Sequence, residues 1–204
     1  MNQKNSLGLN KCFGELENPF KLFEEWFDEA KKSELNDPNA LALATSNKEG
    51  IPSVRMVLLK GFSEKGFVFY TNLKSKKSGD IKSNPQASMC FHWKSLQRQI
   101  RIVGKINSVS DKEADEYYSS RSYGSRIGAW ASKQSTILNN RDQLYTAIDN
   151  YKKKLQHIDV LFSFHDSFSL SVAKYRQHLK NNNINYFSQP FISSLHLDKK
   201  STYM

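Results

Sequence analysis

Cysteine is scarce in this chain: Cys12 and Cys90 are the only two among 204 residues. They lie far apart, and neither has a CxxC partner or a neighbouring histidine. This spacing argues against a disulfide framework and against a structural zinc site. The five histidines form no HExxH motif and no i,i+4 pair, so we expect no metal site.

Two further absences narrow the class of protein. No segment approaches the ~18 consecutive apolar residues of a membrane-spanning helix, and the start, MNQKNSLGLNKCFGELENPF, has no apolar core of a signal peptide. We therefore expect a cytoplasmic protein with no membrane partner. The chain also lacks a GxSxG motif, a P-loop and a GxGxxG motif, the usual signatures of hydrolases, nucleotide triphosphatases and Rossmann proteins.

Positive charge is in excess. Thirty Lys and Arg against twenty Asp and Glu give a formal net charge of +10, which favours an anionic partner such as nucleic acid, a membrane surface or a small phosphorylated ligand. Dispersed lysine can also serve solubility alone. A hydrophobic content of 38% with 12% aromatic residues indicates a globular fold, and the length fits one domain.

Hydrophobic periodicity predicts a helix followed by an antiparallel sheet. Asn18 and Pro19 open an amphipathic helix. Its apolar face comprises Phe20, Phe23, Trp26, Phe27 and Ala30. Between Ala40 and about Val109 the period changes to two in the runs ALALAT, VRMVLLKGF, GFVFYTN, ASMCFHW and RQIRIVGKINSV. Turn-formers at residues 47–50, 64–66 and 84–85 separate most of them, so the sheet curls or closes into a barrel.

Three further helices flank this sheet in the predicted fold, which is mainly β. One covers residues 75–83, and a capping box of Ser110 and Glu113 opens the next, through about Ser119. Asn140 caps the last, in which Leu144, Ile148, Tyr151 and Leu155 share a face. No glycine follows Gly128, and Pro190 is the only turn candidate in the final stretch. We therefore expect no folded continuation of the barrel after about His157.

Two groups of polar residues could bind anions. Arg55 and Lys60 bracket an apolar strand, either to hold an anionic group at the barrel rim or as strand ends in water. Ser75, Lys76, Lys77 and Ser78 open a helix, where unpaired N–H groups and the helix dipole favour phosphate, although such a run can also be solvated. Strand, turn and helix would bring Arg55, Lys60, Thr71, Lys76 and Lys77 to one end of the sheet.

The second group is YYSSRSYGSR at residues 117–126. Its hydroxyls and two guanidiniums suit a second phosphate, because Arg binds phosphate through two parallel hydrogen bonds. The alternative is a polar connection between helices. The following SKQS, residues 132–135, offers neutral groups of the kind that contact the edge of a heterocycle.

In this order and spacing, the segments RMVLLK, GFVFYTN, SKK, RQIRIVGK, EYYSSR and SRIGAWASKQS resemble the pyridoxamine 5′-phosphate oxidase family. The resemblance runs from about Asn18 to about Leu155. It implies an FMN-binding split β-barrel and a homodimer with two FMN sites at the subunit interface. It also implies oxidation of pyridoxamine or pyridoxine 5′-phosphate to pyridoxal 5′-phosphate by hydride transfer to FMN, with O₂ as the final acceptor. No nucleic-acid partner is implied.

The resemblance also implies site residues. Those at FMN-contacting positions are Arg55, Met56, Val57, Leu58, Leu59, Lys60, Tyr70, Thr71, Lys76, Lys77, Gln99, Gln134 and Ser135. Those that would hold the substrate phosphate are Lys60, Tyr117, Arg121 and Ser125. Lys76 stands where the family commonly has Arg, which keeps the charge but loses the bidentate fork.

The last part of the chain departs from the family pattern. The Trp-Gly-Gly segment, the Glu-Phe-Trp strand, the Arg-Leu-His motif beside the substrate ring and the closing Arg-Leu-x-Pro are not found after Leu155. We attribute the three-residue echo at residues 194–196 to chance, and the abrupt change suggests a shifted reading frame. No catalytic residue is therefore assigned, and impaired turnover is expected.

The expected organisation is a flexible N-terminal arm at residues 1–17, the FMN-binding split-barrel domain at 18–157 and a divergent tail of doubtful order at 158–204. Two alternatives to the oxidase stay open. One is a non-catalytic protein that binds flavin or pyridoxal phosphate, and the other is a basic nucleic-acid-binding barrel.

Overall fold

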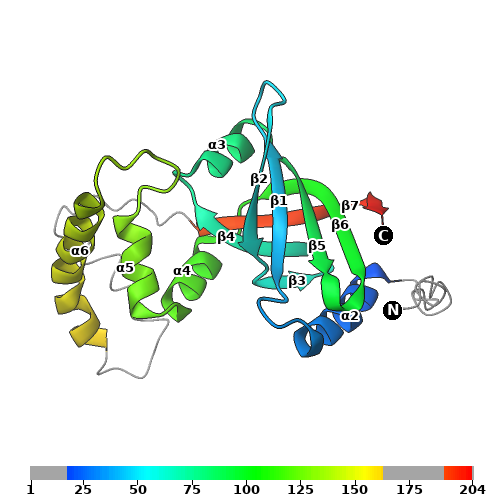
Figure 1. Cartoon of the computed structure of the whole chain (residues 1–204), viewed down its shortest axis with the longest axis horizontal. Helices are drawn as coiled ribbons and strands as arrows, with labels where there is room; N and C mark the ends of the chain where they lie inside the picture. The colour runs from blue at the N-terminus through cyan, green and yellow to red at the C-terminus, as the bar shows by residue number, and fades with distance from the viewer. Residues whose placement is uncertain (1–17, 163–190, 204) are drawn as a thin grey trace.

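The computed structural model describes residues 18–162 and 191–203 of the chain. In chain order the elements are α2 (Pro19–Ser33), β1 (Ala40–Ser46), β2 (Pro52–Leu58), β3 (Gly61–Ser63), β4 (Gly66–Asn72), α3 (Lys76–Ser83), β5 (Gln86–Trp93), the short 3₁₀ turn η2 (Lys94–Leu96), β6 (Arg98–Asn107), α4 (Asp111–Ser120), α5 (Tyr123–Ala131), α6 (Arg141–Phe162) and β7 (Phe191–Tyr203). Figure 1 shows α2 beneath the sheet and α4, α5 and α6 gathered to one side of it.

Helix α2 begins where the sequence predicts. The Asn18 side chain accepts a hydrogen bond from Phe20 N at 2.9 Å, and Pro19 occupies the first turn, where its missing N–H has no cost. The apolar face packs on the sheet through Leu22, Phe23, Trp26, Phe27 and Ala30. Phe23 is its central contact, with ring centroids 4.8 Å from those of both Phe62 and Phe67.

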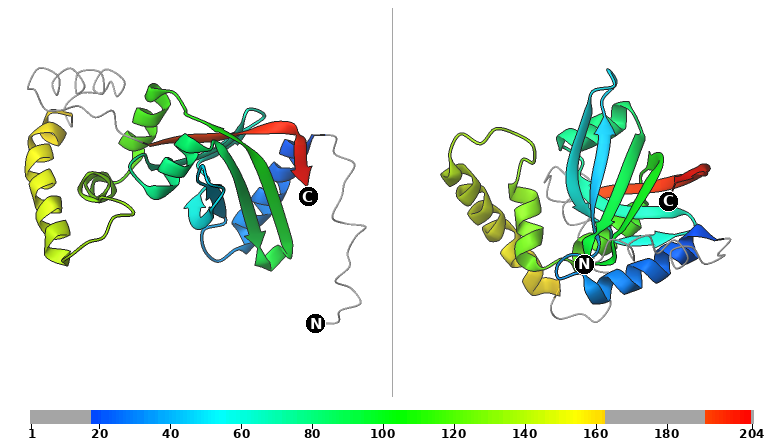
Figure 2. Two further views of the ribbon diagram at one scale, coloured as in Figure 1. Left: turned by 90° about the horizontal axis from the view of Figure 1, so that it is seen from above. Right: turned by 45° about the vertical axis from the view of Figure 1, so that its right-hand side comes forward.

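The seven strands form one antiparallel sheet in the order β2-β1-β5-β6-β7-β4-β3. Its edge strands β2 and β3 are consecutive in the chain, so the sheet curls until the two edges lie near each other (Figure 2). The crossing falls at Leu59, whose N donates to Asn39 O at 2.8 Å, and Lys60, whose N donates to Val68 O at 2.8 Å. The sheet is not closed, and the split-barrel fold is confirmed.

Strict alternation along the strands builds the core. In β1 the buried residues Leu41, Leu43 and Thr45 alternate with half-buried neighbours, and β6 alternates over its whole length. The β1–β2 turn uses Gly50 at φ 79°, a backbone conformation that side-chain-bearing residues rarely adopt. In β1 and β6 this alternation turns one face into the hydrophobic core and leaves the other face outside it.

The structure differs from the sequence expectations at four places. The run VRMVLLKGF is two strands, β2 and β3, because the backbone changes its hydrogen-bond partner there: Leu59 N donates to Asn39 O, but Lys60 N donates to Val68 O. The segment at residues 117–126 does contain a connection between helices, at residues 121–122, but the helix that follows it, α5, is not among those expected, and α6 continues past residue 157 to Phe162. Most notably, part of the expected tail is strand β7, which pairs with β4 and with β6.

The expectation that no barrel strand follows His157 is therefore wrong for residues 191–203. The sequence expectation relied on turn-forming residues between strands. Strand β7 pairs with β4 and β6, which lie far from it in the chain, so it needs no tight turn. The expected arm at residues 1–17, and residues 163–190 of the expected tail, lie outside the described residues. None of the helices that the structure describes is long and apolar enough to cross a membrane.

Candidate functional site

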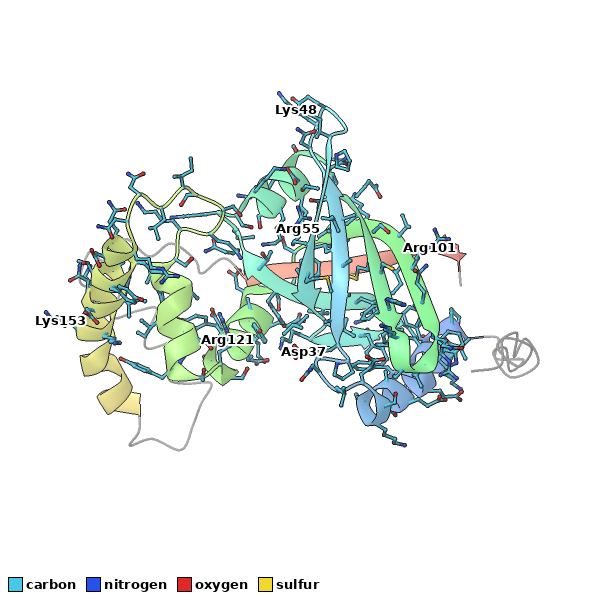
Figure 3. The ribbon with its side chains drawn as sticks, in the orientation of Figure 1. Asp37, Lys48, Arg55, Arg101, Arg121 and Lys153 are labelled. Carbon is cyan, nitrogen blue, oxygen red and sulfur yellow. The ribbon has the colours of Figure 1, made fainter. Side chains whose placement is uncertain are left out.

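A cavity of about 1020 Å³ opens where the two edges of the sheet approach the helices. Strand β2 forms one wall, the end of β4 and the start of α3 form a second, and the α4–α5 corner with the loop after α5 forms a third. Its size is at the upper end of the range for small-molecule and cofactor sites. Figure 3 shows Arg55 on the sheet and Arg121 at the end of α4.

Most of the residues singled out in the sequence line this cavity. From the FMN set these are Arg55, Met56, Val57, Leu58, Lys60, Tyr70, Thr71, Lys76, Lys77, Gln134 and Ser135, and from the substrate set Lys60, Tyr117, Arg121 and Ser125. Residues up to eighty apart in sequence are thus brought to one space, and their roles there stay predictions.

Two predicted residues do not line the cavity. Leu59 is 4% exposed and belongs to the hydrophobic core. Gln99 is exposed on β6, where it pairs with His92 of β5. Within one chain, Gln99 therefore does not contact a molecule bound in this cavity.

Arg55 is fixed between β1 and β2. Its Nη1 donates to Leu43 O at 3.0 Å and to Thr45 Oγ1 at 2.8 Å, and its Nη2 donates to Ser53 Oγ. Nη2 also lies 3.8 Å from Asp80 Oδ2 on α3. Burial lowers the pKa of Arg55, and the carboxylate of Asp80 acts in the opposite direction. The guanidinium is thus a preorganised positive charge at the cavity wall.

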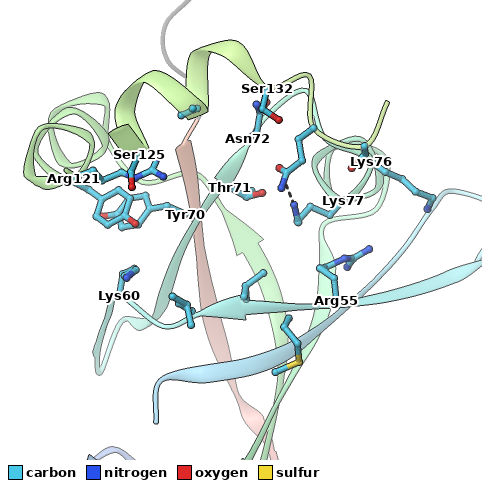
Figure 4. Close-up of a pocket in the computed structure, with 18 of the residues that line it drawn as sticks. Arg55, Lys60, Tyr70, Thr71, Asn72, Lys76, Lys77, Arg121, Ser125 and Ser132 are labelled. Carbon is cyan, nitrogen blue, oxygen red and sulfur yellow. Dashed lines mark hydrogen bonds between the residues drawn. The ribbon is translucent and has the colours of Figure 1, made fainter. Parts of the chain in front are cut away.

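Lys77 is a buried cation, 7% exposed, in the first turn of α3. Its Nζ reaches only neutral oxygens among the contacts found in the described residues, Ser75 Oγ at 3.4 Å and Gln134 Oε1 at 3.3 Å (Figure 4). Burial lowers the pKa of Lys77, and the positive charge of Arg55 lowers it further. Two cations that disfavour each other beside a cavity indicate a site for an anion.

Two more features of this end fit an anionic group. Ser75 is the N-cap of α3 but makes no capping hydrogen bond with its side chain, so that side chain does not cap the N–H groups of Lys76 and Lys77. The hydroxyl of Thr71 is buried and finds no hydrogen-bond partner in the part of the chain that the structure describes. A ligand with acceptor oxygens would satisfy both.

The opposite end of the cavity holds a second positive group. Figure 4 places Lys60, Arg121 and Ser125 there, apart from Arg55, Lys76 and Lys77. The ring of Tyr117 stacks on that of Tyr70 with centroids 3.7 Å apart and planes 4° apart. Lys60 Nζ lies 6.0 Å from the centroid of the Tyr117 ring. Burial raises the pKa of Tyr117, and the charge of Arg121 opposes this shift.

Sequence reasoning missed several residues of the site. Ser53 and Asn72 line the cavity, and Asp80 contacts three of its side chains. Ser53 could have been found, because it lies two residues before Arg55 on the same face of β2. Asp80 carried the weaker signal of an i,i+4 pair with Lys76, which is usually a surface feature.

The fold can now be compared with solved structures. The structure of PhzG from Burkholderia lata 383, in complex with tetrahydrophenazine-1-carboxylic acid, matches with a TM-score of 0.68 and 22% identity over 90% of this chain and 78% of that one. A pyridoxamine 5′-phosphate oxidase-related, FMN binding protein from Nostoc punctiforme matches with a TM-score of 0.52 and 20% identity, over 64% of this chain and 72% of that one. These likenesses define the class of protein as a split barrel.

Sequence comparison identifies the family within that class. Residues 27–154 match the family model described as pyridoxamine 5′-phosphate oxidase. The pyridoxine/pyridoxamine 5′-phosphate oxidase of Pelagibacter ubique is 69% identical over 154 residues, which is 76% of this chain and 74% of that protein. The Brucella canis protein of the same name is 62% identical over 67% of each chain. The chain belongs to the pyridoxamine 5′-phosphate oxidase family.

Tyr70 gives the site a pH signature. Burial is the main cause that raises the pKa of Tyr70 from 10.0 to about 12, and the negative charge of Glu113 adds to it. The folded state keeps this proton where the unfolded chain loses it, so the free energy of unfolding falls as the pH rises from 10 toward 12. Replacing Tyr70 with Phe should flatten that fall, measured as urea midpoints across the range. The exposed Tyr145→Phe serves as control, and an unchanged slope in Tyr70→Phe would contradict the assignment.

Proposed function

We propose that this cavity binds FMN together with pyridoxamine or pyridoxine 5′-phosphate, and that the chain oxidises this substrate to pyridoxal 5′-phosphate with O₂ as acceptor. The observation that carries the proposal is the pair of positive groups at opposite ends of one cavity, in a chain of this family. A flavin mononucleotide and a phosphorylated substrate each bring one phosphate, so two such groups are needed.

The Lys77 end suits the phosphate of FMN. Lys77 and Arg55 supply positive charge at the cavity wall. The N–H groups at the start of α3, which have no side-chain cap, supply directed donors. The unsatisfied hydroxyl of Thr71 offers a further donor beside them. The apolar residues of β2, with Tyr70, would lie along the remainder of the ligand.

The Arg121 end suits the substrate phosphate. Arg121 can hold two phosphate oxygens in a planar fork, and the hydroxyls of Ser125 and Tyr117 add hydrogen bonds. Tyr117 is protonated at neutral pH like any tyrosine, and burial raises its pKa further, so its hydroxyl is a hydrogen-bond donor there. These residues would orient the substrate, while FMN, when bound, supplies the two-electron acceptor of the reaction.

A non-catalytic binding protein is the second candidate. It is favoured by the absence of the family's Arg-Leu-His motif from the sequence. Formation of pyridoxal 5′-phosphate by the purified chain, followed with FMN and O₂ present, separates the two. Flavin binding without formation of pyridoxal 5′-phosphate would support the non-catalytic binding protein instead of the oxidase.

We further propose that the working unit is a homodimer with the cavity at its interface. Val54 and Met56 on β2 are 68% and 66% exposed, yet both line the cavity, which therefore opens onto an apolar surface. A second copy would cover this surface. It would also offer a route by which Gln99 of one chain reaches FMN in the cavity of the other.

The first functional prediction concerns the FMN phosphate. Lys77→Met removes one charge-assisted contact, so it should weaken FMN binding about tenfold or more and leave riboflavin binding nearly unchanged. Flavin fluorescence quenching measures both affinities. Lys82→Met, an exposed lysine on the same helix, is the matched control. Equal losses for the two flavins would show that Lys77 does not contact the phosphate, and no flavin binding by the wild type would favour the nucleic-acid alternative.

A second prediction concerns the substrate phosphate. Arg121→Lys keeps the charge but loses the fork, so binding of pyridoxal 5′-phosphate to the FMN-loaded protein should weaken about tenfold. Flavin content should stay the same. Equilibrium dialysis measures this even if turnover is slow, and unchanged affinity would remove Arg121 from the role.

The third prediction tests Gln99 across the dimer. Gln99→Ala and Lys77→Met should each weaken FMN binding, but mixed dimers of the two variants should regain one tight site per dimer. One cavity then carries both changes, and the other carries neither. If Gln99 instead acts within its own chain, every cavity of the mixed dimer keeps one defect and titration finds no tight site.

A further inference from the structure

A buried carboxylate lies in the positive wall of the cavity. Asp80, in the second turn of α3, is 5% exposed, and its Oδ2 lies 3.8 Å from Arg55 Nη2. Both of its oxygens lie 3.3 Å from Lys76 Nζ. A negative charge so close to a phosphate site repels the ligand, so its presence there requires a compensating role.

Two hydroxyls join Asp80 to Arg55. Thr45 of β1 and Ser53 of β2 face each other across the strand pair. Each accepts a hydrogen bond from Arg55 and donates its own hydrogen to Asp80 Oδ2, at 2.9 Å from Thr45 and 3.1 Å from Ser53. The directions are set by chemistry, because a guanidinium can only donate and an ionised carboxylate can only accept.

This arrangement orders every member of the network. If Asp80 were neutral, the two hydroxyl hydrogens would lose their common acceptor and could turn away. Burial disfavours the ionised form of Asp80, but the hydrogen bonds from Thr45, Lys76 and Ser53 outweigh burial and hold its pKa below the ordinary value. The carboxylate is thus charged at neutral pH and acts on Arg55 through two bridging hydroxyls, those of Thr45 and Ser53, and through one direct contact.

We propose that Asp80 is a positioning residue of the phosphate site, which holds Arg55 and Lys76 in the orientation that binds the phosphate of FMN. The inference rests on the proposed function of the cavity and deepens it. In this role Asp80 itself does not contact the ligand. It links β1, β2 and α3, the three elements that form this end of the cavity.

The sign of one substitution decides the question. Asp80→Asn keeps the shape of the side chain and removes its charge. If Asp80 were only a nearby negative charge, its loss would strengthen FMN binding by removing repulsion. If it positions the cations, its loss weakens FMN binding, because the guanidinium and the ammonium are no longer preorganised.

We expect Asp80→Asn to raise the Kd of FMN about tenfold and to change that of riboflavin less than about twofold. Fluorescence titration of both flavins gives the ratio. Asp28→Asn, which removes a carboxylate from an exposed ion pair on α2, is the matched control. Tighter or unchanged FMN binding overturns the inference, and so does an equal loss for both flavins, which would mark a merely structural role.

A second pair of variants guards against misfolding of Asp80→Asn. Thr45→Val removes one connecting hydroxyl at constant volume and should weaken FMN binding in the same direction. In an Arg55→Met background, Asp80→Asn should lose most of its effect, since the residue through which it acts is gone. An undiminished effect there overturns the inference. Absence of FMN preference over riboflavin in the wild type would instead refute the proposed function.

Discussion

Burial of positive charge is the constraint on which this site depends. An ammonium or guanidinium taken out of water needs an anion or a full set of acceptors. Arg55 meets this need within the protein, through a carbonyl, two hydroxyls and Asp80. Lys77 has only two long contacts to neutral oxygens among the described residues. The protein itself therefore supplies the partners that Arg55 needs, whereas Lys77 leaves room for an anionic ligand as its partner.

The curl of the sheet places these charges opposite Lys60 and Arg121. Because β2 and β3 are consecutive in the chain but lie at opposite edges, the link at Lys60 must cross between them. Its backbone bond to Val68 attaches this link to β4. The same crossing puts the Lys60 side chain next to the Tyr117 ring, so one backbone connection shapes both the barrel and the far end of the cavity.

Local signals in the sequence predicted most of the fold and much of the cavity lining. Asn18 and Ser110 cap helices as expected, because a cap depends on residues a few positions away. The family motifs located the residues from Arg55 to Ser135 that line the cavity. Leu59 shows the limit of a motif match, since a strand alternates and every second residue of the run turns away from the site.

Features set by distant contacts were harder to predict. In the sequence, Asp80 looks like one partner of an i,i+4 ion pair with Lys76 on a helix surface. It is buried because α3 packs on β1, which the local sequence does not show. The family motif places Gln99 at an FMN-contacting position, but it does not show that Gln99 is exposed on β6, outside the cavity of its own chain. Strand β7 lacked a signal for a different reason, since its partners β4 and β6 come from far earlier in the chain.

The position of β7 has a consequence for how the molecule is assembled. In the finished sheet it separates β6 from β4, so among the strands that the structure describes it is β7 that joins the β2-β1-β5-β6 part to the β4-β3 part. A ribosome completes both parts well before it reaches residues 191–203, and until then each part presents a bare strand edge. Such edges pair readily with other chains, and contacts of long sequence separation form slowly. The nascent protein must therefore pass through a stage in which its sheet is divided and most open to aggregation.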